Sequence, residues 1–393
     1  MSSIVTKRFA SGASKLLRTP LYDCHVELGG KMVDYAGFEM PVLYKGQTHV
    51  ESHNWVRSKV GLFDVSHMLQ HKFKGAQPRE LLQKITPIDL AYLPINSSSL
   101  TVLLNKNGGV IDDCIITKHG ENDYYMVTNA GCRTKDVKFI KEEAANFDVD
   151  HSTFEGTLLA IQGPEAAGLL QKFTNEDLSK ITFGNTKYLK LSLIGADVHL
   201  ARSGYTGEDG FELLIPSSTP QESQESQNFF RSLIEDYPDL VRPIGLAARD
   251  SLRLEAGMCL YGHELAEDIT PIEATLTWLI PKLRRDEKNA TFNGASKILS
   301  QIKDKTLCSK KRIGLLSKGP SPRDGNKLFS EDGKEIGHIT SGSPSPTLGG
   351  NVAQAYADKL LKSGTKVFFE LRGKKREAIV AKMPFVESKF YRG

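Results

Sequence analysis

This sequence of 393 residues lacks long apolar runs, has few cysteines and starts with a segment that contains no acidic residue. No segment approaches the roughly 18 consecutive apolar residues that a membrane-spanning helix needs, so we do not expect a membrane protein. The five cysteines are an odd number and include no C-x-x-C pair. This pattern favours reduced thiols over a disulfide framework or a zinc site.

Several enzyme signatures are also missing. The glycine-rich run at residues 204–212 is not G-x-G-x-x-G and precedes no helix, which argues against a dinucleotide site. Ser251 is not in a G-x-S-x-G setting, so a serine hydrolase is not supported. His49 and His53 lie one helical turn apart without the H-E-x-x-H pattern or further ligands at metal spacing. We therefore expect no metal.

The first twenty residues have the composition of a mitochondrial presequence. They hold four basic residues and no acid, and the first acidic residue is Asp23. On a helical wheel Val5, Phe9 and Leu16 share one side and the basic residues the other. A disordered basic tail is the alternative. We predict a presequence over residues 1–18 and a protein of the mitochondrial matrix.

Charge is divided unevenly along the rest of the chain. Residues 21–300 carry 28 basic and 38 acidic side chains, whereas residues 301–393 carry 19 and 9. A basic terminal region beside an acidic body suggests an anionic partner. Lys374, Lys375 and Arg376 form a dense but short basic run, so we do not expect a nucleic-acid surface.

Short strands alternate with helices in a way that favours an α+β fold over a doubly wound sheet. We predict two intertwined α+β domains over residues 19–280, a connection over 281–310 and a small β-barrel domain over 311–393. Expected helices span residues 48–60, 78–85, 134–145, 164–173, 224–236 and 246–256. Expected strands before residue 217 span residues 62–74, 100–105, 110–117, 124–128, 158–161, 187–201 and 211–216.

Three short runs carry residues that suit ligand chemistry. Asp112 and Asp113 follow a hairpin turn and point to opposite faces of one strand, so they do not form a cooperating pair. In the run at 204–212, Tyr205 can cover a flat ligand and three acids, among them Glu212, offer acceptors. On the helix at 246–256, the Arg249 guanidinium suits a planar acceptor. Solvated turns and a salt-bridged surface helix are the plain alternatives.

Seven runs taken together resemble one family, the aminomethyltransferases, also known as the T-protein of the glycine cleavage system. The resemblance extends from about residue 19 to the C-terminus and looks like a mitochondrial member. The runs are residues 19–22, 63–68, 108–113, 127–131, 204–212, 245–257 and 382–385.

The resemblance implies a reaction and a fold. Family members move the carbon of an aminomethyl group from the lipoyl arm of H-protein to tetrahydrofolate. The products are 5,10-methylenetetrahydrofolate, ammonia and the dihydrolipoyl arm. H-protein and the other glycine cleavage components are the implied partners. The implied fold is a three-domain cloverleaf around a central folate pocket.

The family's motifs also imply roles for individual residues. Asp113 matches the catalytic aspartate, and Glu212 matches the carboxylate that accepts from the folate ring. A C-terminal tyrosine contact of relatives is here Phe390, followed by Tyr391. The further implied folate-contacting or pocket residues are Tyr205, Trp278, Arg249, Arg312, Met68 and Asn129.

Two other functions remain compatible with this resemblance. One is a non-catalytic, folate-binding assembly factor of iron–sulfur proteins on the same fold. Those relatives carry a K-G-C-x-x-G-Q-E-like run, whose lysine and glutamine are missing at residues 256–264. The other is a folate-accepting domain of a sarcosine or dimethylglycine dehydrogenase, which needs a fused flavin domain for which this chain has no room. Fold alone does not separate these functions.

Overall fold

The computed structural model describes residues 15–358 and 361–393. Most of the predicted presequence therefore lies outside the described residues. The chain divides into two compact units, each built from separate segments. Unit one gathers the chain up to Leu69 with Phe154–Ala256 and Val386–Gly393, and unit two gathers Gln70–Thr153 and Gly257–Phe385. No described helix has the length and apolarity to cross a bilayer.

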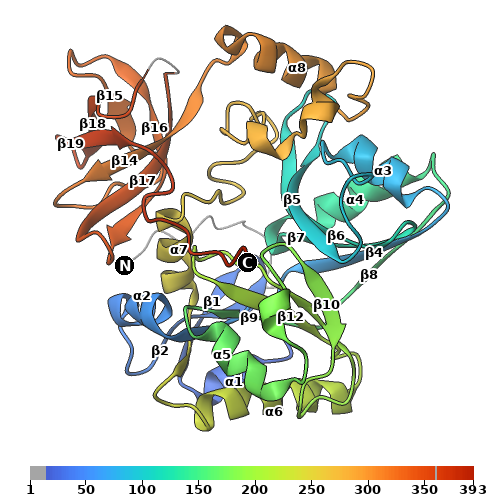
Figure 1. Ribbon diagram of the computed structural model, residues 1–393. Helices are drawn as coiled ribbons and strands as arrows, with labels where there is room; N and C mark the ends of the chain where they lie inside the picture. Colours follow the sequence, from blue (N-terminus) through green and yellow to red (C-terminus); the bar gives the residue numbers. More distant parts are fainter. Residues whose placement is uncertain (1–14, 359–360) are drawn as a thin grey trace. The chain divides into compact units, whose positions relative to one another are not determined.

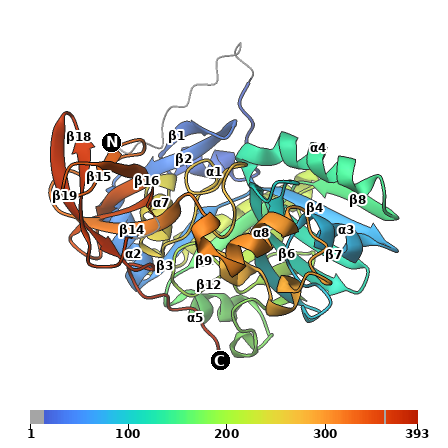
Figure 2. The ribbon, with the colours of Figure 1, turned by 90° about the horizontal axis from the view of Figure 1, so that it is seen from above.

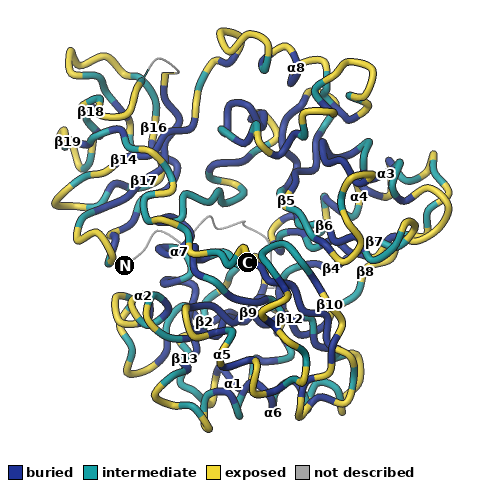
Figure 3. Tube along the Cα trace, viewed as in Figure 1, coloured by how far each residue is buried: buried dark blue, intermediate teal, exposed yellow. Residues whose placement is uncertain are grey.

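Unit one is built on a six-stranded sheet in the order β10-β11-β12-β9-β3-β13 (Figure 1). Strands β3 and β9 are buried along their whole length, as Figure 3 shows for β9. Side chains of α1, α5 and α6 join them in one apolar core. Only the pairing of β13 with β3 is parallel among the pairings assigned in this sheet. The elements are α1 (Tyr22–Glu27), β1 (Gly30–Tyr35), β2 (Phe38–Tyr44), α2 (His49–Ser58), β3 (Val60–Asp64), β9 (Thr157–Gln162), α5 (Ala166–Leu170), β10 (Thr186–Leu189), β11 (Val198–Ala201), β12 (Gly210–Ile215), α6 (Pro220–Glu235), β13 (Val241–Pro243) and α7 (Leu246–Glu255).

Unit two begins with a five-stranded sheet in the order β5-β6-β7-β4-β8. Helices α3 and α4 bury their apolar sides against it. The predicted helix at 78–85 is confirmed residue for residue as α3, which starts with proline at its first turn. The elements are β4 (Leu69–Gly75), α3 (Pro78–Ile85), β5 (Ser97–Leu104), β6 (Val110–Gly120), β7 (Asp123–Thr128), α4 (Arg133–Ala144) and β8 (Val149–Phe154).

The second part of unit two ends in a closed barrel in the order β14-β17-β16-β15-β18-β19, coloured orange to red in Figure 2. Strand β14 pairs with β17 on one side and β19 on the other, which closes the ring. The predicted small β-barrel, and with it the α+β fold class, is confirmed. The elements are α8 (Ala295–Lys303), β14 (Lys311–Ser317), β15 (Lys327–Phe329), β16 (Glu335–Ser345), β17 (Gly350–Ala357), β18 (Lys366–Leu371) and β19 (Lys374–Ala381).

Two predicted single strands are wrong. Residues 62–74 form β3 and β4, separated by a turn in which the Met68 N–H donates to the Val65 carbonyl. Residues 187–201 likewise form the antiparallel pair β10 and β11. Alternating side chains look the same in one long strand and in two strands joined by a turn, so the pattern alone did not reveal either break.

Candidate functional site

Asp113 lies on β6, just after a tight hairpin turn. Gly108 has a φ of +76°, and a Cβ at Gly109 would come within 1.8 Å of the Glu267 carbonyl oxygen. The predicted opposite orientation of the two acids is confirmed, because Asp112 is fully buried whereas Asp113 is half-buried. The hairpin therefore holds Asp113 at the boundary between the interior of unit two and its surface.

Asn129 links the two acids. Its side-chain Nδ2 donates to Asp113 Oδ1 and to Asp112 Oδ1, both at 2.9 Å, and its backbone N–H donates to Asp112 Oδ2 at 2.9 Å. Asn129 follows β7, which pairs with β6. That Asp112 and Asp113 do not form a cooperating pair stays a prediction: they face different sides of the strand, yet one amide at the strand end reaches both.

The surroundings of Asp113 raise the pKa of its carboxyl group close to neutral pH. Burial first, and then the negative charge of Asp112, raise the pKa of the Asp113 carboxyl to about 7, against the lowering effect of Asn129. A carboxyl with such a pKa can accept and return a proton near neutrality. Among the described residues, no hydrogen bond occupies Oδ2 of Asp113, so this oxygen is open to a ligand.

The predicted hairpin connection at residues 204–212 is confirmed, because it joins β11 to the adjacent antiparallel strand β12 in unit one. A Cβ at Gly204 would lie 1.9 Å from Gln162 Oε1, and one at Gly210 would lie 2.3 Å from the Ile161 carbonyl oxygen. Gly207 has a φ of +79°. Gly204 and Gly210 are thus required for this loop to lie against β9, and Gly207 for the left-handed backbone of its turn.

Of the three acids in this loop, only Glu212 is half-buried with an oxygen that no described residue binds, because the unbound Oε2 of Glu208 is buried. Glu208 is buried and forms ion pairs with Arg57 at 3.0 Å and Lys389 at 3.2 Å. Asp209 is held by both Nε and Nη2 of Arg202. Glu212 is half-buried and accepts from the Ser203 hydroxyl at 2.8 Å through Oε2. No described residue donates to its Oε1.

Helix α7 places Arg249 beside this loop. The Arg249 guanidinium carbon lies 5.0 Å from the centre of the Tyr205 ring, so the two predicted ligand contacts are neighbours in unit one. On the same helix, Ser251 Oγ lies 2.7 Å from His53 Nδ1, and His53 Nε2 lies 3.1 Å from Glu255. This Ser–His–Glu group is fully buried and joins α2 to α7, so it meets no substrate.

The C-terminal residues cross the same loop. The Lys389 N–H donates to the Gly207 carbonyl at 2.8 Å, and the Val386 N–H donates to the Glu255 carbonyl at 3.0 Å. Phe390 stacks on Phe183 with ring centres 4.2 Å apart. We refer to residues 386–393 as the C-terminal strap. The next residue in the strap, Tyr391, has its ring centre 4.0 Å from the guanidinium carbon of Arg202.

The remaining predicted residues differ in their surroundings. Met68 is half-buried at the turn after β3 in unit one. In unit two, the Trp278 side chain is 64% exposed on a single 3-10 turn, where it can cover a flat ligand. Arg312 is buried, and it donates to the Ala274 and Gly257 carbonyls and to Gln354. The bonds to the two carbonyls fix the barrel to the preceding segment.

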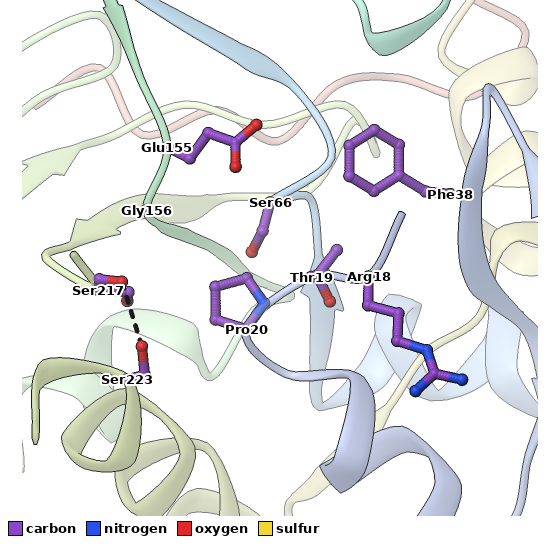
Figure 4. A pocket seen from close by; sticks show the side chains of 9 residues that line it. All are labelled: Arg18, Thr19, Pro20, Phe38, Ser66, Glu155, Gly156, Ser217 and Ser223. Atoms are coloured by element: carbon purple, nitrogen blue, oxygen red, sulfur yellow. Dashed lines mark hydrogen bonds between the residues drawn. The ribbon is translucent and has the colours of Figure 1, made fainter. Parts of the chain in front are cut away.

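A small cavity of about 220 Å³ in unit one contains none of the predicted site residues (Figure 4). Two of its hydroxyl groups, those of Thr19 and Ser66, donate to Asp64 at 2.6 Å. A third, that of Ser223, donates to the Ser217 carbonyl. Because these hydroxyls are already satisfied within the protein, this cavity is not the candidate site.

The structure thus groups the predicted residues into two sets. Unit one brings together Glu212, Tyr205 and Arg249, with Phe390 on the strap beside the same loop. Unit two joins Asp113 to Asn129. Sequence reasoning missed Ser203, which orients Glu212, and the contact between Asp112 and Asn129. Neither has a sequence signal, because each depends on partners that only the paired strands bring together.

Comparisons with known proteins cover nearly the whole chain. The GCVT N-terminal domain family matches residues 21–284, and the glycine cleavage T-protein C-terminal barrel domain matches residues 310–387. The mitochondrial aminomethyltransferase of Saccharomyces cerevisiae is 48% identical over 409 residues, which covers 100% of this chain and 99% of that protein. The mitochondrial aminomethyltransferase of Pisum sativum is 45% identical over 395 residues, covering 99% and 94%.

The fold is also similar to a solved structure. The crystal structure of glycine cleavage system aminomethyltransferase T from Bartonella henselae superposes with a TM-score of 0.88 at 36% sequence identity. The similarity covers 96% of this chain and 100% of that one. Both the α+β region and the barrel are therefore shared.

Proposed function

This chain belongs to the glycine cleavage T-protein family, and on that premise we propose how its residues serve the reaction. The chain is an aminomethyltransferase of the glycine cleavage system, and its family uses tetrahydrofolate. The proposed substrates are the aminomethyl-lipoyl arm of H-protein and tetrahydrofolate. The products are 5,10-methylenetetrahydrofolate, ammonia and the dihydrolipoyl arm.

The observation that carries the proposed chemistry is the setting of Asp113. Its Oδ1 is fixed by Asn129, its Oδ2 is open, and its pKa is raised to about 7. A carboxylate in this state can take a proton from a folate nitrogen and stabilise positive charge on the transferred carbon. Asp112 is fully buried and accepts from Asn129 through both oxygens, so it is less suited to this role.

Glu212 is proposed to hold the folate ring. The ring presents an amide N–H beside an exocyclic amine, and a carboxylate with one open oxygen suits such a donor pair. Ser203 fixes the other oxygen and so sets the direction of the carboxylate. Tyr205 is proposed to cover the ring, and Arg249 beside it to bind polar or anionic parts of the ligand.

Further contacts are proposed from both units. The exposed Trp278 ring is available for stacking, whereas Arg312 retains only the donors that its protein partners do not use. Met68 and Phe390 are proposed as apolar contacts. Asn129 is proposed to act mainly through Asp113, because its amide is already engaged there.

Lipoylated H-protein is the proposed donor partner, together with the other components of the system to which the family belongs. The similar proteins are mitochondrial, and we propose that this chain works in the mitochondrial matrix. We propose no metal, no membrane and no nucleic acid for the reaction. We also propose residues 19–280 as the folate-binding region, 281–310 as a connection and 311–393 as the barrel domain.

An ammonia-release assay tests the proposal. Purified protein is mixed with aminomethyl-loaded H-protein and tetrahydrofolate, and ammonia and 5,10-methylenetetrahydrofolate are measured. Both products should form together, and omission of tetrahydrofolate should suppress them. Tight folate binding without either product would instead favour the non-catalytic assembly factor.

A further inference from the structure

A group of buried polar side chains lies behind Asp113 in unit two. Asp112 lies on β6, Cys132 directly precedes α4, and Asp136 lies in the first turn of α4. All three side chains are buried. One carboxylate oxygen from each acid and the thiol sulfur lie within 4.8 Å of one another. The proposed function assigns no role to Asp136.

Asp136 has an unusual environment for a carboxyl group. Its side chain is fully buried, and neither oxygen has a hydrogen-bond donor of sound geometry among the described residues. Its neighbour Asp112 already accepts two N–H groups from Asn129. Two ionised carboxylates in contact, away from water and without a counter-charge, would repel each other strongly. Either a proton or a cation must therefore separate them.

The surroundings favour a proton over a metal ion. Both oxygens of Asp112 are occupied by Asn129, which leaves too few ligands for a closed metal site. Burial, followed by the charges of Asp112 and Asp136, raises the pKa of the Cys132 thiol well above its usual range, so a thiolate is disfavoured. Lys135, which precedes Asp136 in the chain, directs its ammonium to Tyr261 and Glu267.

We propose that Asp136 is a protonated acid that donates a hydrogen bond to Asp112, and that this pair holds Asn129 in position for Asp113. Asp136 is thus a positioning residue. This inference rests on the proposed function, because Asp113 is the residue it serves. Other groups around Asp136 are Thr128, Cys132 and Lys135. Thr128 in turn contacts His71, which keeps that hydroxyl within a wholly buried network.

A raised pKa of the Asp136 carboxyl agrees with this geometry. Burial first, and then the charge of Asp112, raise the pKa of Asp136 to about 9. The proton is therefore held at neutral pH and lost only in alkaline solution. Its loss would place a second negative charge beside Asp112 and disturb the hydrogen bonds to Asn129.

Two substitutions separate this role from simple packing. In Asp136→Asn the amide N–H replaces the acid proton as donor to Asp112, whereas Asp136→Leu fills the space without a donor. We expect Asp136→Asn to stay within about threefold of the unmutated kcat. Asp136→Leu should lose about 10–100-fold, the range for groups that orient a reacting residue, with the KM for tetrahydrofolate unchanged. Equal kcat in the two folded variants would overturn the proposal.

The pH profile gives a sharper comparison. In the unmutated protein kcat should fall above pH of about 9 as Asp136 ionises. In Asp136→Asn that fall should be absent, because an amide does not ionise. The same alkaline limb in both proteins would contradict the role of this proton.

A spectroscopic test does not depend on activity. The infrared difference between the unmutated protein and Asp136→Asn at pH 7 should contain the carbonyl band of a protonated carboxylic acid. The band should disappear from the unmutated protein in alkaline solution. Absence of the band, or a stoichiometric metal ion retained by the purified protein, would overturn the inference. An inactive unmutated protein that shows the band would instead count against the proposed function alone.

Discussion

Asp113 has one carboxylate oxygen that no described residue binds, and its surroundings disfavour a negative charge. We expect Asp113→Asn to lower turnover by about 10²–10⁴-fold, because the carboxylate that accepts the proton is removed. Ammonia release under saturating substrates measures the effect. Asp150→Asn, which removes an exposed carboxylate from the same unit, is the matched control and should be neutral.

The same substitution should also stabilise the fold. The folded pKa of Asp113, about 7, lies above the value near 3.9 expected in the unfolded chain. The free energy of unfolding therefore falls as pH rises from about 4 to 7. Above a pH of about 7, this loss of stability is complete and stays constant. Asp113→Asn removes this cost, so its Tm should rise while its activity falls. A lowered Tm would show that the activity loss comes from misfolding.

The pH dependence of catalysis should report on Asp113 and its neighbour. Because the ionised form accepts the proton, kcat/KM should rise as pH increases through about 7 and stay level until Asp136 ionises at a pH of about 9. Asp112→Asn removes the charge that raises this pKa, so the midpoint should move to lower pH. The same change should reduce kcat by disturbing Asn129. A midpoint unchanged in Asp112→Asn would refute the coupling.

Glu212 should contribute to folate affinity rather than to chemistry. We expect Glu212→Ala to weaken tetrahydrofolate binding by about 1.5–3 kcal/mol, the range for hydrogen bonds to a charged group. Ser203→Ala should have a smaller effect in the same direction, because it only frees the carboxylate to move. Calorimetry measures both. Unchanged affinity in Glu212→Ala and in Arg249→Ala would exclude this loop as the folate contact.

At the scale of elements, the N-terminal segment contains two parts with different roles. The Leu17 N–H donates to the Gly37 carbonyl at 2.9 Å, its carbonyl accepts from Glu39 at 2.9 Å, and Arg18 pairs with Glu39. Residues 17 and 18 thus belong to the folded unit, although we predicted them to be within the presequence. Removal of the presequence by cleavage before Leu17 would retain these contacts.

Two deletions test this division. Removal of residues 1–14 should abolish import into isolated mitochondria and leave Tm and ammonia release unchanged. Removal of residues 1–18 should also lower Tm, because the contacts to the β1–β2 hairpin are lost. Normal import of the shorter chains would rule out a presequence here.

Elements with local signals were predictable and others were not. The capping box of Thr48 and Glu51 marked the start of α2, and the structure contains both of its hydrogen bonds. The β1–β2 hairpin was missed because Ala36, at a φ of +54°, and Gly37 replace the usual Asn-Gly turn. Strands β13 and β15 have three residues each, too few for an alternating pattern.

The candidate site was predictable only in part. The motifs pointed to Asp113 and Glu212, but nothing in the spacing ranked Glu208 and Asp209 below Glu212. That ranking follows from two ion pairs in the folded protein: Arg57 binds Glu208, and Arg202 binds Asp209. Asp136 was not anticipated, because a helix residue of this type is usually solvated and its burial depends on tertiary packing.

For the whole molecule, the charge division leads to a prediction about H-protein. Lys374 and Lys375 are exposed on β19, and we expect them with Arg376 to attract an acidic partner. Replacing the three with glutamine should raise the KM for loaded H-protein at low salt and leave kcat unchanged. The difference should vanish as salt rises, because the Debye length is about 10 Å at 0.1 M.

A matched control keeps the change in net charge constant. Glutamine at the exposed Lys106, Lys138 and Lys297 removes the same charge from unit two outside the barrel. Its KM should remain unchanged. An equal KM effect in both triple variants would indicate general attraction, and no effect in either would show that the charges on β19 are simply solvated and do not guide H-protein.

The C-terminal strap sets the order in which a newly made chain can finish folding. Unit two is complete in sequence at Phe385, whereas unit one still requires Val386–Gly393. During synthesis or import with the N-terminus first, Lys389 is among the last residues to emerge. The loop at 204–212 therefore gains its hydrogen bond and its ion pair with Lys389 only at the end. The loop that we propose to bind folate therefore forms its last contacts after the segment that carries Asp113, the proposed catalytic residue, has been made.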